Sequence, residues 1–284
     1  MFIRRSHLQI LLIILTGVWS NTASARQHRS RCWTQHDTPP TSGYQIAEFT
    51  THFKATDTWR ANNVRRAAAR LNGTELHAYE TFSYNDTVGP RTEETGFEYA
   101  PVIFRGELKY KPGGGVCQPS STLHAAAVLC GLKVVKRRPH SWQSAYIASG
   151  FDAAVAWRMK DLILKNPYSF KVRIAAEIGE SHLTMRLFAD DAPSGWFDLE
   201  TTALSQRSFD EVREFTKKLP PGESKVHRKG ITGLKLARTM VKSRPDGTRR
   251  RIPWSTDVYR PRTQVIRIGA DDDEDTELPV TPAH

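Results

Sequence analysis

Residues 112–124 read PGGGVCQPSSTLH, three glycines leading into a cysteine and then a proline. Proline is favoured in the first turn of a helix, where its missing N–H costs nothing. Pro119 is therefore a helix-start signal, alanines fill the following turns, and Gly131 suits the position just beyond the helix end. The stretch predicts a helix over 119–130 that begins two residues after Cys117.

A cysteine at a helix N-terminus is suited to nucleophilic chemistry. The unpaired N–H groups and the helix dipole favour negative charge there, and the thiolate is the reactive form of cysteine. The glycines at 113–115 allow backbone conformations that a side chain would forbid, and they let a substrate approach the main chain. Nearby N–H groups would form an oxyanion hole. The alternative is a glycine turn beside a packed, structural cysteine.

A nucleophilic cysteine needs a base that takes and returns its proton. His140, in RRPHSW (137–142), lies in a loop after a predicted strand that returns beside the helix, and we predict it as the base. A surface histidine is the alternative. His124 lies two helical turns from Cys117, about 10 Å along the axis and too far for contact. Asp152, in GFDAAV, would orient the imidazole, although an aspartate in a turn is the plainer interpretation.

Substrate-binding residues are predicted around the same stretch. Arg91, in VGPRTEETG (88–96), has a guanidinium suited to gripping a carboxylate through two hydrogen bonds. Exposed pairing with the neighbouring glutamates is the alternative. The other predicted contacts are Gly114, Gly115, Gln118, Ser120 and Ser121. No spacing resembles the CxxC or HxxxH pairs of a zinc site, so no metal or other cofactor is expected.

Hydrophobic periodicity predicts an α+β fold with a mixed, mostly antiparallel sheet and a few short helices, followed by a small all-β module. A helix is predicted at 58–71, with apolar residues on one face and arginines on the other. Strands are predicted at 44–53, 76–85, 100–110, 132–138, 170–178 and 181–189. The predicted division is a catalytic domain at 44–190, a linker at 191–224 with a short charged helix at 208–218, and the β-module at 225–269.

The chain ends carry export and tail signals. Arg4, Arg5, the apolar run 8–19 and Ala23-Ser24-Ala25 predict a signal peptide over 1–25. That run is short for a membrane span, which needs ~20 residues, and a retained anchor is the alternative. Residues 26–43 are predicted as a flexible leader and 270–284 as an acidic disordered tail. No later segment is apolar enough to span a membrane.

Charge and cysteine content bear on partners and compartment. The net charge of +11 suits an anionic partner, and outside the cytoplasm this favours wall polymers or lipid surfaces over nucleic acid. Solubility alone is the alternative. Of the three cysteines, Cys117 is the predicted free thiol, which leaves Cys32 and Cys130 as a possible pair. Export usually means an oxidising compartment.

Long motifs within 46–190 resemble the VanW family. They are FSYNDTVGPRTEETG (82–96), GGGVCQPSSTL (113–123) and PHS (139–141), supported by GFDAAV (150–155) and LKNPYSFKVRI (164–174). Pro119 stands where valine is common in the family, a change that a first helical turn tolerates. STDVYRPRTQVIRIG (255–269) more weakly resembles glycine-containing β-modules that follow VanW domains and are associated with cell-wall sugars.

The resemblance implies a function. The family was named for its occurrence in glycopeptide-resistance clusters, and members have been linked to peptidoglycan cross-linking as cysteine-dependent L,D-transpeptidases. By this resemblance Cys117 would be the nucleophile and His140 the general acid/base for acyl transfer between stem peptides; the roles of Arg91 and Asp152 follow less directly. The protein would be periplasmic or wall-associated. The alternatives are a cysteine peptidase or L,D-carboxypeptidase acting on wall peptides, and a non-catalytic wall-binding protein.

Overall fold

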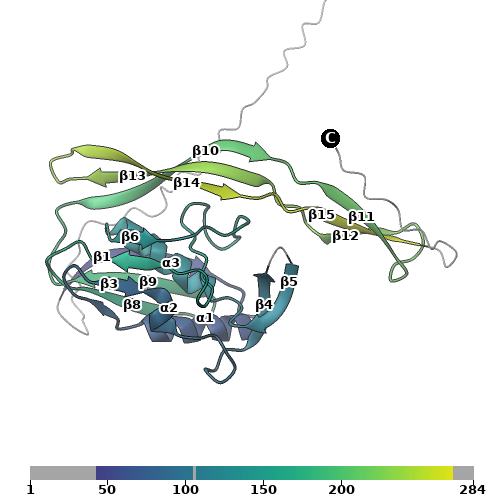
Figure 1. Cartoon of the computed structure of the whole chain (residues 1–284), viewed down its shortest axis with the longest axis horizontal. Helices are drawn as coiled ribbons and strands as arrows, with labels where there is room; N and C mark the ends of the chain where they lie inside the picture. Colours follow the sequence, from purple (N-terminus) through teal and green to yellow (C-terminus); the bar gives the residue numbers. More distant parts are fainter. Residues whose placement is uncertain (1–42, 105–106, 271–284) are drawn as a thin grey trace, which may run out of the picture.

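A computed structural model describes residues 43–104 and 107–270 (Figure 1). The predicted signal peptide, nearly all of the predicted leader and acidic tail, and Cys32 lie outside these residues. Within the described ranges, no helix is long and apolar enough to cross a membrane.

A four-stranded antiparallel sheet forms the centre of the compact part at 44–190. Its order is β1 (Tyr44–His52), β9 (His182–Ala189), β8 (Val172–Ile178) and β2 (Glu75–Leu76). Two helices pack on it and on each other: α1 (Thr58–Leu71) contacts β8, and α3 (Cys117–Leu129) contacts β1 and β9. The predicted helix at 58–71 and the predicted hairpin of 170–178 with 181–189 are confirmed. The buried side chains of α1 recur at helical spacing: Ala61, Asn63, Val64, Ala67, Ala68 and Leu71.

Smaller elements surround this centre. A second sheet has the order β3 (Thr81–Ser83), β7 (Ile163–Lys165) and β6 (Lys133–Lys136), and β4 (Tyr99–Phe104) pairs with β5 (Glu107–Pro112) as a hairpin. The single strand predicted at 76–85 is wrong, because the chain breaks after β2 and turns into α2 (Tyr84–Val88). Ser83 caps that helix, since its hydroxyl accepts the Asp86 N–H at 3.1 Å.

Two three-stranded sheets make up the rest of the chain. The first, here called the platform sheet, has the order β10 (Trp196–Arg207), β13 (Gly233–Ser243) and β14 (Arg249–Tyr259). The second has the order β11 (Glu211–Thr216), β15 (Gln264–Gly269) and β12 (Ser224–Arg228). Figure 1 shows the platform sheet lying across the compact part and the second sheet extending beyond it. The α+β class with mostly antiparallel strands is confirmed, β11–β15 being a parallel pair.

The secondary structure predicted for the linker is wrong. Residues 208–218 contain strand β11 where a short charged helix was expected. The reason is long-range: β11 pairs along its whole length with β15, about fifty residues later, and such pairing overrides local propensity. The β-structure also begins at Trp196, because β10 pairs with β13.

The platform sheet is packed directly onto the compact part. Leu199 of β10 belongs to the main hydrophobic core, and Met240 and Trp254 pack against it. Gly131 follows α3 with φ +79°, and a Cβ there would lie 2.2 Å from the Phe197 ring. The two parts therefore share one buried interface, and the candidate site lies beside it.

Candidate active site

Cys117 is the first residue of α3. The helix starts two residues earlier than predicted, with Val116 as its N-cap, and Pro119 still lies in the first turn. The thiol is partly buried. Its sulfur lies 3.5 Å from the N–H of Val155, which donates to it, and 3.4 Å from the Val155 carbonyl oxygen.

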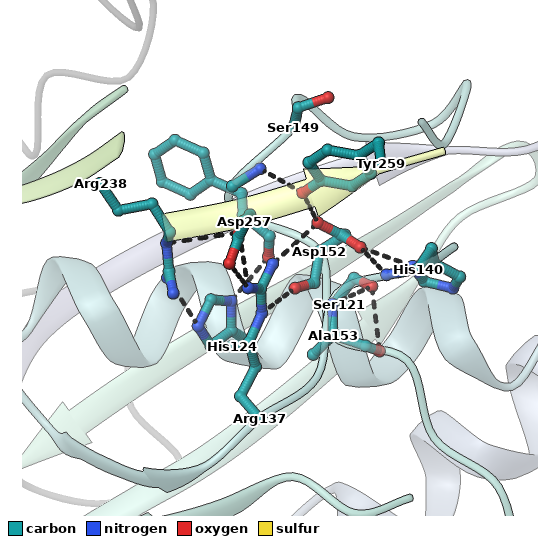
Figure 2. Close-up of polar contacts among 12 residues, drawn as sticks. Ser121, His124, Arg137, His140, Ser149, Asp152, Ala153, Arg238, Asp257 and Tyr259 are labelled. Atoms are coloured by element: carbon teal, nitrogen blue, oxygen red, sulfur yellow. Dashed lines mark hydrogen bonds and ion pairs between the residues drawn. The ribbon is translucent and has the colours of Figure 1, made fainter. Parts of the chain in front are cut away.

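His140 lies next to this thiol, and Asp152 contacts the imidazole of His140. The Asp152 Oδ2 is 2.7 Å from His140 Nδ1, and it also accepts the main-chain N–H of His140 at 2.7 Å (Figure 2). The imidazole also lies close enough to the Cys117 thiol to influence the pKa of that thiol. Asp152 is almost completely buried. The three side chains therefore form one chain from carboxylate through imidazole to sulfur, which is the arrangement that activates a nucleophile.

The three pKa values shift in the directions that an ion pair requires. Burial alone would raise the pKa of the Cys117 thiol, but the hydrogen bond and charge of His140 reverse this and lower it. Burial opposes protonation of His140, yet its bonds to Asp152 and Cys117 raise the pKa to about 9. The pKa of Asp152 is well below its usual range, because bonding to His140 and the charge of Arg137 outweigh burial. The shifts therefore favour a thiolate beside an imidazolium.

We expect iodoacetamide to label Cys117 quickly at neutral pH in the folded protein and to leave Cys130 unmodified. Cys130 is a buried free thiol whose pKa burial raises to about 12, so its thiolate is scarce. Labelling over time, followed by peptide mapping, measures both rates. Cys117 reacting no faster than cysteine in an unstructured peptide would contradict the ion pair. The predicted pairing of Cys130 with Cys32 remains a prediction, since Cys32 lies outside the described residues.

Arg91 points toward the same site with unused hydrogen-bonding capacity. Its Nη1 donates to Asn85 Oδ1 at 2.8 Å, and its guanidinium lies over the rings of Tyr84 and Trp157, 5.4 and 5.8 Å from their centroids. Its Nε and Nη2 are buried without a hydrogen-bond partner. Its charge also contributes to lowering the pKa of Cys117. A hollow of about 380 Å³ lined in part by Asn85 and Trp157 opens next to these partners.

The glycines at 113–115 allow neighbouring parts of the protein to pack closely against the loop. A Cβ on Gly114 would lie 2.7 Å from the backbone of Ala100, and one on Gly115 would lie 2.9 Å from Cγ of Arg60. Asn63 of α1 donates to the Gly114 carbonyl oxygen at 3.0 Å. The structure thus gives Gly114 and Gly115 a packing reason, in addition to the substrate approach that the sequence predicted.

Three predicted substrate contacts point into the protein. Gln118, Ser120 and Ser121 are completely buried. The Gln118 amide donates to the Thr51 hydroxyl at 3.0 Å, which ties α3 to β1. Ser121 accepts the Ala153 N–H at 2.9 Å, and this bond holds the segment that carries Asp152. Gln118 and Ser121 thereby position the site, and the substrate-binding role of the three residues stays a prediction.

Several residues at the site have no local sequence signal. Arg60 lies on α1, its Nη2 donates to Gln118 Oε1 at 3.3 Å, and its Nε is buried without a partner. Tyr146 stands edge-on to His140, with ring centroids 6.3 Å apart. Arg137 and Tyr259 contact Asp152. In the sequence, Arg60 resembles any charged residue on the exposed face of an amphipathic helix. Tyr259 gives no signal because it is distant in sequence from the other site residues. Among the described residues, no group of three or more His, Cys, Asp or Glu side chains is placed to hold a metal ion.

Fold and site together define a class: an α+β domain with a cysteine–histidine–aspartate arrangement at a helix N-terminus, followed by an all-β extension. Residues 59–188 match the family model described as VanW like protein.

Two curated relatives match part of the chain. The chain is 34% identical over 150 residues to the uncharacterized protein YoaR of Bacillus subtilis (strain 168), covering 53% of this chain and 50% of that one. It is 24% identical over 161 residues to the vancomycin B-type resistance protein VanW of Enterococcus faecalis (strain ATCC 700802 / V583), covering 55% and 58%. The chain spans about half the length of the curated relatives it matches.

Two solved structures show a partial similarity. The G5 domain of an IgA1 protease is 21% identical with a TM-score of 0.20, covering 27% of this chain and 89% of that one. HP0197-G5 is 16% identical with a TM-score of 0.15, covering 26% and 97%.

Proposed function

We propose that this protein is an exported cell-wall enzyme that transfers the acyl group of a peptidoglycan stem peptide through a thioester on Cys117. The observation that carries this proposal is the group Cys117, His140 and Asp152 at the start of α3, in which His140 is hydrogen-bonded to Asp152 and lowers the pKa of the Cys117 thiol. The VanW-like domain and a relative named for vancomycin resistance support a wall-related role.

The chemistry has two halves. The Cys117 thiolate attacks the carbonyl carbon of an L-centred residue that precedes a terminal D-amino acid, and the C–N bond breaks as the His140 imidazolium protonates the leaving amine. The product of this half is a thioester. The amine of a second stem peptide then attacks, His140 takes its proton, and the C–S bond breaks to restore the thiolate. If water attacks instead, the enzyme is an L,D-carboxypeptidase.

The N-terminus of α3 would stabilise the oxyanion of each half-reaction. The N–H groups of Val116 and Gln118 are used within the turn, at 3.2 Å to Gly113 O and 2.9 Å to Gly115 O. We assign the oxyanion to the N–H of Cys117 itself, supported by the positive end of the helix dipole.

Two arginines supply the binding site for the donor's terminal carboxylate. Arg91 has two buried nitrogens without a partner and Arg60 has one, and buried donors left unsatisfied are costly unless a ligand fills them. Arg60 lies against Gly115 and over the ring of Tyr146, 5.8 Å from its centroid. Arginine binds carboxylates through paired hydrogen bonds, so a C-terminal D-amino acid matches this environment.

Intact-protein mass spectrometry with a tetrapeptide-bearing muropeptide tests the proposal. We expect wild-type protein to gain the mass of the stem peptide less its terminal D-alanine, with the adduct mapping to Cys117. The Cys117→Ser protein should show no thioester adduct, and the matched variant Cys130→Ser should behave as wild type, because that thiol is buried away from the site. Folded wild-type protein that forms neither adduct nor product would contradict the proposal for this donor.

A non-catalytic wall-binding role is the second candidate, and one surface feature favours it. The β13–β14 hairpin exposes a group of arginines that suits an anionic polymer: Arg244, Arg249, Arg250 and Arg251. Binding that survives Cys117→Ser but falls on substitution of these arginines, in a protein that forms no adduct, would support this candidate over catalysis.

A further inference from the structure

We propose that the platform sheet is part of the active site, with Tyr259 and Asp257 of β14 acting as positioning residues that hold Asp152 against His140. The inference rests on the proposed function, because it concerns the same cysteine–histidine–aspartate site. If the inference holds, the chemistry requires the platform sheet. A separately attached binding module, by contrast, would not affect the chemistry.

Tyr259 connects the sheet to the catalytic carboxylate. Its side chain is buried, and its hydroxyl donates to Asp152 Oδ1 at 2.5 Å (Figure 2). The same hydroxyl accepts the main-chain N–H of Gly150 at 2.7 Å. One hydroxyl of β14 therefore fixes both the carboxylate and the turn that carries it, 107 residues away in sequence.

Arg137 makes the second connection. Its Nη2 donates to Asp152 Oδ1 at 2.9 Å and its Nε to the Asp152 carbonyl oxygen at 2.6 Å, while its Nη1 lies 2.6 Å from both carboxylate oxygens of Asp257. All three side chains are at most 4% exposed. Asp257 thus anchors Arg137 from the platform sheet, and Arg137 anchors Asp152.

These contacts divide the Asp152 carboxylate between two tasks. Its Oδ1 is held by Tyr259 and Arg137, which leaves Oδ2 to accept two bonds from His140. Because Tyr259 and Arg137 hold Oδ1, the Asp152 carboxylate cannot rotate, and its Oδ2 stays aligned with the His140 imidazole. Support for the imidazolium therefore depends on groups of β14.

The surrounding charges are balanced within the same network. Arg238 of β13 lies 3.8 Å from Asp257 and 4.1 Å from the Trp254 ring centroid. It also contacts His124 at 3.2 Å, and burial together with the charges of Arg238 and Arg137 keeps the pKa of His124 well below its ordinary value. Two cations, Arg137 and Arg238, thus face the two anions Asp152 and Asp257, with His124 neutral.

The loop that carries His140 is clamped from the C-terminal part as well. The Arg260 N–H donates to the Ser141 carbonyl oxygen at 2.7 Å. The Gln143 amide donates to the Thr232 carbonyl oxygen at 2.8 Å. Both bonds lie close in sequence to His140, so both ends of the His140–Asp152 pair are positioned by residues of the C-terminal part.

Tyr259→Phe is the first test, with Tyr168→Phe as its matched control. Both tyrosines use a hydroxyl hydrogen bond in the interior, but the Tyr168 hydroxyl donates to the Cys130 carbonyl oxygen at 2.6 Å, away from Asp152. Without the Tyr259 hydroxyl, Arg137 alone holds Oδ1 of Asp152, so we expect Oδ2 to be less well aligned with His140 and to support the imidazolium less. The rate of Cys117 alkylation by iodoacetamide, measured against pH, reports the pKa of the thiol. We expect this pKa to rise by about one unit, which lowers the alkylation rate about tenfold at pH values below it. Imidazole NMR should show the pKa of His140 falling.

The outcomes separate the inference from the proposed function. Thiol titration needs no substrate, so a shift in Tyr259→Phe alone supports the inference even if muropeptides form no adduct. Profiles of Tyr259→Phe and Tyr168→Phe that superimpose on wild type would overturn it, whatever the activity. Asp257→Asn gives an independent reading: it removes one negative charge and leaves a buried cation unbalanced, so the pKa of His140 should fall. An unchanged pKa of His140 in a folded Asp257→Asn protein would also overturn the inference.

Discussion

Replacing His140 with asparagine is expected to lower the acyl-transfer rate by about 10²–10⁴-fold, the usual contribution of a general acid–base group. The variant loses the proton donor for the leaving amine and the base for the incoming amine. It also loses the group that lowers the thiol pKa, since burial alone raises that pKa. Asparagine retains a polar side chain beside Asp152, so the protein should remain folded. Muropeptide turnover measured by chromatography gives the effect.

The pH profile makes this prediction specific. His140 has its pKa raised to about 9, so the wild-type rate should fall as pH rises through this value and the imidazolium loses its proton. The rate should also fall on the acid side as the thiolate is protonated. In His140→Asn the alkaline limb should disappear, and the alkylation profile of Cys117 should move to higher pH. His77→Asn is the matched control, because His77 is exposed at the end of β2. Equal profiles for the two variants would contradict a role for His140.

The local parts of the fold and site follow from sequence, because neighbouring residues determine them. The face of α1 is set by apolar spacing within fourteen residues. The start of α3 follows from Cys117 and Pro119, which lie next to it in sequence, although the helix begins at Cys117 and the prediction began at 119. His140 and Asp152 lie twelve residues apart, so a single loop brings them together and their pairing could be predicted.

The remaining parts depend on contacts between distant segments. Strand β11 is charged enough to suggest a helix, and only its pairing with β15 makes it a strand. Tyr259 and Asp257 sit more than a hundred residues from the groups that they hold, Asp152 and Arg137. In sequence they belong to an alternating β-segment, and nothing local indicates a buried hydroxyl and carboxylate. The first-turn polar residues show the converse: Gln118 and Ser121 lie next to the nucleophile in sequence, yet their side chains face the interior.

Replacing Arg137 with methionine is expected to destabilise the protein by about 3–5 kcal/mol, the cost of removing one partner from a buried ion pair. Methionine fills much of the same volume, so the effect comes mainly from charge. The variant leaves Asp152 and Asp257 buried without the cation that bridges them. Denaturant unfolding measures the change. Arg186→Met is the matched control: Arg186 also bridges two carboxylates, Glu48 and Glu177, but on the surface, where such pairs contribute ~1 kcal/mol or less.

The pH dependence of this destabilisation identifies its cause. The pKa of Asp152 is held below its usual range in the folded protein, so its ionised form stabilises the fold above the ordinary carboxyl pKa, and this contribution is lost as pH falls. Arg137 provides much of that contribution. The difference in unfolding free energy between wild type and Arg137→Met should therefore be large at neutral pH and shrink on acidification, when the carboxylate is protonated in the variant. A difference that stays constant with pH would mean that Arg137 acts through packing of its stem, and the electrostatic link from Asp257 to Asp152 would then lose its support.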